Sequence, residues 1–210
     1  MTHLKIKVCG MREPANISGV VAANPDFVGF IFYPKSKRFV GFHPLPEVLA
    51  VVPGSVKKVG VFVDEIPETV LSVCASWDLE AIQLHGKESP EYCGQMKRSG
   101  LVVIKAFSVD ESFDFSALEA YRDSCDFFLF DTKSQLPGGS GQKFNWHLLN
   151  NYLLDSPFFL SGGIGFEDVK AIRELSHPQL FAIDINSGFE IRPALKDIEK
   201  VGKFIHEIRQ

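Results

Sequence analysis

Apolar residues gather in short runs along the chain, and each run precedes a longer segment that mixes polar and apolar positions. Short apolar runs are typical of buried strands, and the longer mixed segments are typical of helices that bury one face. The pattern predicts eight strands, at residues 4–9, 26–32, 57–63, 80–85, 101–107, 126–131, 157–161 and 180–185.

A helical segment follows each predicted strand. Pro14, Pro67 and Pro90 stand near helix starts, where a missing backbone N–H does no harm. The predicted helices cover residues 13–23, 44–52, 67–76, 90–99, 113–123, 145–154, 166–175 and 195–209.

Strict alternation of strand and helix predicts a parallel sheet, because each helix returns the chain to the same edge. Eight units of roughly 26 residues fit a closed α/β barrel with short loops. A doubly wound sheet would carry a glycine fingerprint after its first strand, and only Gly10 follows Cys9. We therefore expect one domain, residues 1–210, folded as a single-domain (β/α)8 TIM barrel.

Composition narrows the class of protein. The 210 residues are 45% hydrophobic and 23% charged with a net charge of −4, which is typical of a soluble globular protein without affinity for nucleic acid. The amino terminus lacks a secretory apolar core, and no apolar stretch reaches the roughly 18–20 residues that span a membrane. Four scattered cysteines favour reduced thiols, so we expect a cytoplasmic protein.

The active site of such a barrel lies at the carboxyl ends of its strands, where the loops converge. Five of the eight strand-end residues are titratable, so the predicted mouth is polar. In chain order the strand-end residues are Cys9, Phe32, Asp64, His85, Phe107, Asp131, Ser161 and Asp184.

Alternation along the strands predicts which side chains enter the barrel, because residues two apart share a face. A buried ammonium is costly without a carboxylate partner, so we predict that Lys7 pairs with an interior acid. The residues expected to point inward are Lys5, Lys7, Cys9, Phe127, Leu129, Asp131, Ala182 and Asp184.

Three glycine-rich loops follow the sixth, seventh and eighth strands, at residues 138–141, 161–165 and 186–188. Glycine lets backbone amides approach an oxyanion, and the loops after strands seven and eight are the recurring phosphate site of this fold. The alternative is that the glycines only turn the chain. The candidate phosphate-binding residues are Gly139, Gly141, Gly162, Gly163, Ser187 and Gly188.

The motifs together resemble the phosphoribosylanthranilate isomerase family of tryptophan biosynthesis over essentially the whole chain. The segments that carry the resemblance, in family order, are KVCGMREP, DFVGFIFYPKSKRFV, KVGVFVDE, IQLHGKESPE, FDTKSQLPGGSGQKFNW, LSGGIG and DINSGFE.

The resemblance implies an Amadori rearrangement that needs no metal and no organic cofactor. It assigns the general base to Cys9 and the general acid to Asp131. A thiolate base needs positive charge nearby, for which Lys7 and Arg38 are candidates. Asp131 must be protonated to act as an acid, which burial or a neighbouring acidic charge would promote.

The resemblance also implies substrate contacts. Arg38 matches the arginine that contacts the anthranilate end, and the alternative is a solvated surface arginine. Gln83 and His85 match QLHG and are expected at the substrate or directly behind it. Asp184 either orients the substrate amine or Arg38, or it partners an interior lysine. Asp64 has the weakest case, since it can simply cap the third helix.

One departure from the family pattern lies after the eighth strand, where Asn186 replaces the first of two serines found in many members. Cys74, Cys93 and Cys125 match no catalytic motif and are expected to pack in the core or on helices.

Three other functions stay open at the sequence level. They are a sugar-phosphate isomerase of another pathway, a metal-dependent epimerase and a non-catalytic phosphate-binding barrel. The first is disfavoured because Cys9 stands where the related histidine-pathway barrel has an acid. A metal site is not expected, because only His85 among six histidines is suitably placed. The expected partner is a small phosphorylated substrate, and the expected assembly is a monomer with a homodimer as the alternative.

Overall fold

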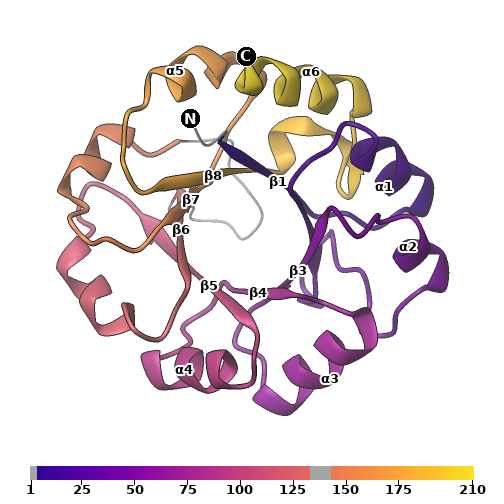
Figure 1. Ribbon diagram of the computed structural model, residues 1–210, viewed down its shortest axis with the longest axis horizontal. Coiled ribbons are helices and arrows are strands. Elements are labelled where there is room, and N and C mark those ends of the chain that lie inside the picture. The colour runs from indigo at the N-terminus through magenta and orange to yellow at the C-terminus, as the bar shows by residue number, and fades with distance from the viewer. Residues whose placement is uncertain (1–3, 133–142) are drawn as a thin grey trace.

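The strands form a closed parallel barrel in which each strand pairs with the next and the last pairs with the first (Figure 1). The structure is a computed structural model and describes residues 4–132 and 143–210. The predicted TIM barrel is confirmed. Its strands are β1 Lys5–Cys9, β2 Phe27–Ile31, β3 Lys57–Phe62, β4 Ala81–Leu84, β5 Val102–Val109, β6 Phe127–Thr132, β7 Phe158–Leu160 and β8 Leu180–Ile185.

Helices surround the barrel, and α6 packs beside α1 to close the outer ring (Figure 1). In the described part of the chain, none of them has both the length and the apolar character needed to cross a membrane. The α-helices are α1 Pro14–Val21, α2 Pro46–Ala50, α3 Pro67–Trp77, α4 Pro90–Arg98, α5 Val169–Glu174 and α6 Ile198–Arg209.

Shorter 3-10 turns replace some of the predicted helices. They are η1 Phe115–Tyr121, η2 Trp146–Asn151, η3 Phe166–Asp168 and η4 Ser187–Phe189. In η1 the buried side chains Phe115 and Leu118 are three residues apart, and a 3-10 turn places such positions on one face. The helices expected at 113–123 and 145–154 are therefore 3-10 turns, and the one expected at 166–175 is divided into η3 and α5.

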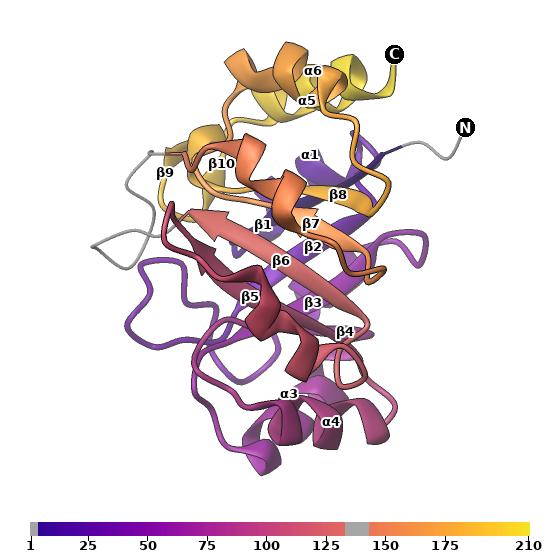
Figure 2. The ribbon, with the colours of Figure 1, turned by 90° about the vertical axis from the view of Figure 1, so that its left-hand side faces the viewer.

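The predicted last helix is wrong at its start. Leu195–Lys196 forms strand β10, which pairs antiparallel with β9, Glu190–Arg192. The helix begins only at Ile198, because the Asp197 side chain accepts a hydrogen bond from the Lys200 backbone N–H at 3.0 Å and caps it. In Figure 2 the β9–β10 hairpin lies at the end of the barrel toward which the arrow of β6 points.

Two apolar layers hold the barrel. The outer layer lies between strands and helices and includes Ile6, Val8 and Phe32. The inner layer fills the barrel and confirms the inward direction predicted for Leu129 and Ala182. The inner layer consists of Val59, Ala81, Ile104, Ala106, Leu129, Phe159 and Ala182.

Barrel closure also brings charged residues together. In the pairing of β1 with β8, Lys7 lies beside Asp184. Lys5, the other lysine of β1, is less buried than Lys7. Its side chain is half exposed, and its ammonium lies 2.9 Å from the carboxylate of Asp26, the residue just before β2. The polar interior therefore begins at Lys7 and extends toward the carboxyl ends of the strands.

Candidate active site

Lys7 is the centre of the polar interior. Its ammonium lies 3.0 Å from both carboxylate oxygens of Asp184 and 2.8 Å from Oε1 of Gln83, and its side chain is wholly buried. The predicted pairing of Lys7 with an interior acid is confirmed. Burial lowers the pKa of Lys7, but the negative charges of Asp184 and Cys9 outweigh it and hold the pKa above its ordinary value. The partners of Lys7 therefore favour its charged form inside the barrel.

A row of hydrogen-bonding groups leads from Lys7 to the mouth. Nε2 of Gln83 lies 2.7 Å from Nδ1 of His85, and Nε2 of His85 lies 3.4 Å from Oδ2 of Asp131. The other carboxylate oxygen of Asp131 accepts a hydrogen bond from the Thr132 backbone N–H at 2.8 Å. His85 and Asp131 keep 31% and 27% of their side chains exposed, so a ligand in the mouth can reach both.

Cys9 ends β1 beside this row and is buried. A Cβ added to Gly29 would come within 2.9 Å of its sulfur, so the neighbouring strand must carry glycine at that position. Burial raises the pKa of the Cys9 thiol, while the positive charges of Lys7 and Lys196 act in the opposite direction. The thiol is thus a strong base once ionised, held among cations that stabilise its thiolate.

Arg38 is buried, with only 7% of its surface exposed, so the alternative of a solvated surface arginine is wrong. Its Nε and Nη2 atoms donate to the carboxylate of Glu190 at 2.8 and 2.6 Å, and these bonds raise the pKa of Arg38. Glu190, and not Asp184, is thus the acid that orients Arg38. Asp184 is instead the partner of an interior lysine, Lys7, which was the alternative expected for it.

Glu190 and Lys196, both in the β9–β10 hairpin, were missed by sequence reasoning. The Lys196 ammonium lies 2.8 Å from Oε1 of Glu190 and 2.7 Å from Oδ1 of Asn186. Burial lowers the pKa of Lys196, although Glu190 acts against this shift. The final letter of the DINSGFE motif is Glu190 and was an available signal, whereas the segment around Lys196 resembled the start of a helix.

Asn186, the departure from the family pattern, therefore has a structural role in this chain. Its side-chain oxygen and its backbone carbonyl both accept hydrogen bonds from Lys196, at 2.7 and 3.3 Å. The residue holds the lysine, and its side-chain oxygen faces the interior cluster of charges.

The glycine loops after β7 and β8 lie close to one another and to the end of β6. Gly162 has φ +95°, and an added Cβ would come within 2.4 Å of the Thr132 backbone nitrogen. A Cβ on Gly188 would come within 2.3 Å of the Ile164 carbonyl oxygen. Gly163 also has a positive φ, of 65°. Bulkier residues would separate these loops, so their glycines bring the backbones together at the predicted phosphate position.

Ser187 begins η4, in the loop after β8. Lys200 reaches this loop, and its ammonium donates a hydrogen bond to the Gly188 carbonyl at 2.7 Å. The Lys200 ammonium of α6 therefore lies beside this loop, and the sequence did not predict this positive charge at the candidate phosphate site. Gly139 and Gly141, predicted to bind phosphate as well, lie outside the described residues.

Asp64 does not cap the third helix. The residue before α3 is Ile66, which makes no side-chain cap, and Oδ1 of Asp64 instead accepts a hydrogen bond from the Lys87 backbone N–H at 2.6 Å. Asp64 therefore links the loops after β3 and β4. The three cysteines that match no catalytic motif are buried, as expected for packing residues: Cys74, Cys93 and Cys125.

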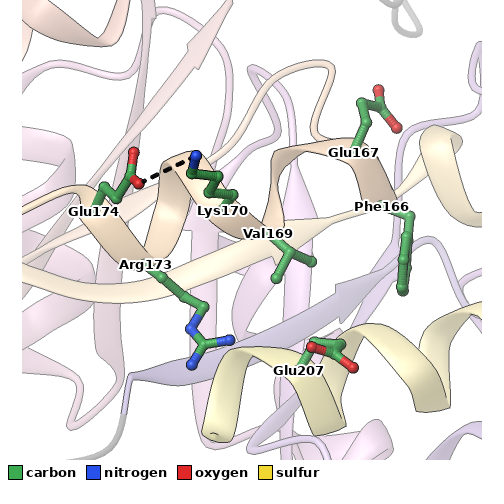
Figure 3. Close-up of a pocket in the computed structure, with 7 residues that line it drawn as sticks. All are labelled: Phe166, Glu167, Val169, Lys170, Arg173, Glu174 and Glu207. Carbon is green, nitrogen blue, oxygen red and sulfur yellow. Dashed lines mark ion pairs between the residues drawn. The ribbon is translucent and has the colours of Figure 1, made fainter.

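A groove lies away from the mouth, between α5 and α6 (Figure 3). Its charged side chains include the ion pair of Lys170 with Glu174 at 3.9 Å, and it contains none of the predicted site residues. Within residues 4–132 and 143–210, no three histidine, cysteine or acidic side chains are grouped to hold a metal ion. The titratable groups that the structure brings together at the mouth are Cys9, Asp131, His85 and the cations around them.

A TIM barrel whose mouth combines a thiol, an imidazole and carboxylates belongs to the enzymes of this fold. Comparison with known proteins identifies which enzymes. A sequence model of the N-(5'-phosphoribosyl)anthranilate (PRA) isomerase family matches residues 6–207. The chain belongs to the N-(5'-phosphoribosyl)anthranilate isomerase family, and this membership decides among the functions that the sequence left open.

Individual relatives agree with this assignment. The N-(5'-phosphoribosyl)anthranilate isomerase of Parabacteroides distasonis is 47% identical over 204 residues, which cover 97% of this chain and 92% of the relative. The phosphoribosyl anthranilate isomerase of Thermus thermophilus is 27% identical with a TM-score of 0.85, and the match covers 98% of each chain. Another such isomerase, in complex with reduced 1-(o-carboxyphenylamino)-1-deoxyribulose 5-phosphate, is 32% identical with a TM-score of 0.81 over 98% of each chain.

Proposed function

We propose that this chain isomerises N-(5'-phosphoribosyl)anthranilate to 1-(2-carboxyphenylamino)-1-deoxyribulose 5-phosphate, with Cys9 as general base and Asp131 as general acid. The reaction is an Amadori rearrangement of tryptophan biosynthesis in the cytoplasm, catalysed by one domain, residues 1–210. The observation that carries the proposal is the polar row from Lys7 through Gln83 and His85 to the Asp131 carboxyl, together with the buried Cys9 thiol under the charge of Lys7.

The first step opens the sugar ring. Asp131 donates its proton to the furanose ring oxygen, the bond from that oxygen to C1′ breaks, and the anthranilate nitrogen forms a C=N double bond to C1′. The product of this step is a cationic Schiff base. Asp131, which is 27% exposed at the mouth, is accessible to the ring oxygen of a bound sugar.

The second step removes the proton from C2′. The Cys9 thiolate takes this proton, and the electron pair of the C–H bond forms the C1′=C2′ bond while the nitrogen becomes a neutral amine. Proton gain at C1′ and proton loss from the 2′-hydroxyl then give the ketone, so no atom is gained or lost overall. Burial raises the pKa of Cys9, which makes the thiolate a strong base, and the cationic Schiff base favours its formation.

The charged ends of the substrate have separate partners in this proposal. Glu190 contacts Nε and Nη2 of Arg38, which leaves Nη1 for the anthranilate carboxylate. Asp184, which is paired with Lys7, orients the substrate amine by its charge, and His85 contacts the sugar. The phosphate binds to the loops after β6, β7 and β8, through Gly139, Gly141, Gly162, Gly163, Ser187 and Gly188.

An assay with substrate generated in situ tests the reaction. Anthranilate and phosphoribosyl pyrophosphate are converted by their transferase into the fluorescent substrate, and its fluorescence decays faster in the presence of this protein. Cys9→Ser and Asp131→Asn should each lower kcat by roughly 10²–10⁴-fold while circular dichroism shows a folded barrel.

Matched variants separate lost chemistry from lost structure. Cys74→Ala in α3 and Asp123→Asn on the surface change the same residue types away from the mouth and should keep the wild-type rate. A folded wild-type protein that does not accelerate the decay would refute the isomerase function. Full activity in both site variants would refute the two assigned roles.

The assembly that we propose is a monomer, with a homodimer as the alternative. Sedimentation analysis distinguishes the monomer from the alternative homodimer.

A further inference from the structure

Gln83 lies between the Lys7 ammonium and the His85 ring, and the chemistry of Lys7 determines how its amide is oriented. An ammonium group only donates hydrogen bonds, so the Gln83 atom 2.8 Å from Lys7 must be the amide oxygen. With 2% of its surface exposed, Gln83 is held in this orientation by buried neighbours. The amide nitrogen therefore faces the other way, toward His85.

The orientation of Gln83 in turn determines the tautomer of His85. The amide nitrogen lies 2.7 Å from Nδ1 and can only donate, so Nδ1 must be unprotonated and accept. A neutral imidazole with an unprotonated Nδ1 carries its proton on Nε2.

The Nε2–H group of His85 is the one next to Asp131, with 3.4 Å between Nε2 and Oδ2. The Thr132 backbone N–H already serves Oδ1, so each oxygen of the carboxyl group has an N–H donor beside it. We propose that Gln83 is a positioning residue, which keeps His85 in the Nε2–H tautomer so that the carboxylate left when Asp131 gives up its proton meets a donor.

The proposal deepens the proposed isomerase function and rests on it. Asp131 transfers one proton to the ring oxygen and gains one negative charge, while His85 keeps its proton and only donates a hydrogen bond. The opposite tautomer would face the new carboxylate with a lone pair and oppose the transfer. The distance of 3.4 Å is long for a hydrogen bond, and such contacts commonly tighten when substrate binds.

This role differs from direct substrate contact by Gln83. The other charged groups that face this region are Lys7 and Asp184. Their direct pairing at 3.0 Å does not involve residue 83, although Gln83→Met also removes the hydrogen bond between Lys7 and Gln83. Because Gln83→Glu keeps an acceptor for Lys7, a loss of kcat shared by Gln83→Glu and Gln83→Met would reach Asp131 through His85.

Nitrogen NMR of the full-length protein reads the tautomer without substrate and so independently of the enzymatic activity. With ¹⁵N-labelled histidine at neutral pH, the His85 signals, identified by their loss in His85→Asn, should show an unprotonated Nδ1 and a protonated Nε2. A protonated Nδ1 in the wild-type protein would overturn the proposal, whatever the isomerase assay shows.

Two variants test whether Gln83 causes the tautomer. Gln83→Glu still accepts from Lys7 but offers His85 an acceptor, so Nδ1 should become protonated. Gln83→Met removes both bonds, so the two tautomers should coexist. Gln95→Met, at an exposed position of α4, is the matched control and should leave the His85 signals unchanged. The wild-type tautomer in both Gln83 variants would overturn the proposal.

Kinetics test the role of the tautomer in catalysis. For Gln83→Met we expect kcat to fall roughly tenfold, the effect of one misplaced hydrogen bond, with KM changed less than about twofold. A change confined to KM would mean that Gln83 contacts substrate and does not act through Asp131. An unchanged kcat in a variant with mixed tautomers would equally refute the role.

Discussion

At the scale of single residues, the site is built from charges that are removed from water yet paired. Lys7 and Asp184 are both buried at a separation of 3.0 Å. Arg38 and Lys196, whose charges also act on Cys9, share the carboxylate of Glu190. Buried charges are tolerated only when each has a partner, so removing one partner leaves a larger penalty than the pair ever contributed. These pairs keep three cations around one thiol.

Replacement of Lys7 tests this view. Lys7→Met leaves Asp184 buried without its partner, and we expect the free energy of unfolding to fall by about 3–5 kcal/mol. Urea denaturation followed by circular dichroism measures this loss. Asp184→Asn in the same chain should restore part of it, because the second change removes the unpaired charge.

The control for Lys7 is Lys170→Met, which breaks an exposed pair with Glu174 and should leave the urea midpoint unchanged. If the double variant Lys7→Met with Asp184→Asn lost more free energy of unfolding than the two single variants together, the pairing argument would be contradicted.

At the scale of elements, the β9–β10 hairpin completes the site. It lies after the last barrel strand, at the carboxyl end of the barrel (Figure 2), and contributes Glu190 and Lys196 to the region around Cys9 and Arg38. The hairpin is short, yet it supplies both the acid that orients Arg38 and the second cation near the thiol. The hairpin is therefore part of the candidate active site as well as a connection to α6.

Lys196→Met tests the contribution of the hairpin to the base. Lys196 lowers the pKa of Cys9, so its removal should move that pKa upward, and alkylation of the thiol by iodoacetamide should then require a higher pH. The remaining charges around Cys9, on Lys7, Asp184 and Arg38, are unchanged. We expect kcat to fall roughly 10- to 100-fold at neutral pH.

Lys203→Met, on the exposed face of α6, is the matched control and should leave both the alkylation profile and kcat as in the wild-type protein. An alkylation profile in Lys196→Met that moves to lower pH would contradict the electrostatic role of this lysine.

The elements also show what a sequence pattern can predict. The eight strands were predictable because apolar runs are bounded by polar turns, and Pro67 and Pro90 mark the true starts of α3 and α4. The 3-10 turns were predicted as helices, since a one-dimensional pattern does not distinguish a spacing of three from a mixed helical spacing. The β10 strand was missed because its pairing with β9 depends on contacts that no local pattern contains.

At the scale of the whole molecule, one carboxylate joins the beginning and the end of the chain. Asp26 accepts hydrogen bonds from Lys5 and from the Ile6 backbone N–H at 2.9 Å, and from Arg209 of α6 at 2.8 Å. Burial raises the pKa of Asp26, but these donors outweigh it and hold the pKa below its ordinary value. This cluster ties α6 to the base of β1, at the seam where the barrel closes.

Acid should therefore weaken the seam. A carboxylate with a lowered folded-state pKa stabilises the fold above its unfolded pKa of about 3.9, and this contribution is lost as pH falls through the folded value. Asp26→Asn should lower the free energy of unfolding by roughly 1–2 kcal/mol at pH 7.

The difference between Asp26→Asn and the wild-type protein should shrink in acid, where both side chains are uncharged. Urea denaturation at pH 7 and below pH 3 measures it. A difference that grows toward low pH would contradict the assigned direction of the shift.

The candidate site was predictable where it follows from strand position. Cys9, Asp131 and Asp184 end or nearly end their strands, and alternation alone predicted the inward ammonium of Lys7. Glu190 could not be assigned as the partner of Arg38, because the two residues are 152 positions apart and the contact depends on the path of two loops. Distances across a folded barrel are three-dimensional information that a residue pattern does not carry.

The ion pair between Lys7 and Asp184 spans 177 positions, and this spacing orders events during synthesis. The ribosome releases β1 early and β8 late, so the buried ammonium has no carboxylate until nearly the whole chain has been made. Any product truncated before Asp184 also lacks Glu190 and Lys196. An incomplete copy of this enzyme leaves the Lys7 ammonium buried without its carboxylate. We therefore expect it to be unstable and to be degraded by proteases before it can bind substrate.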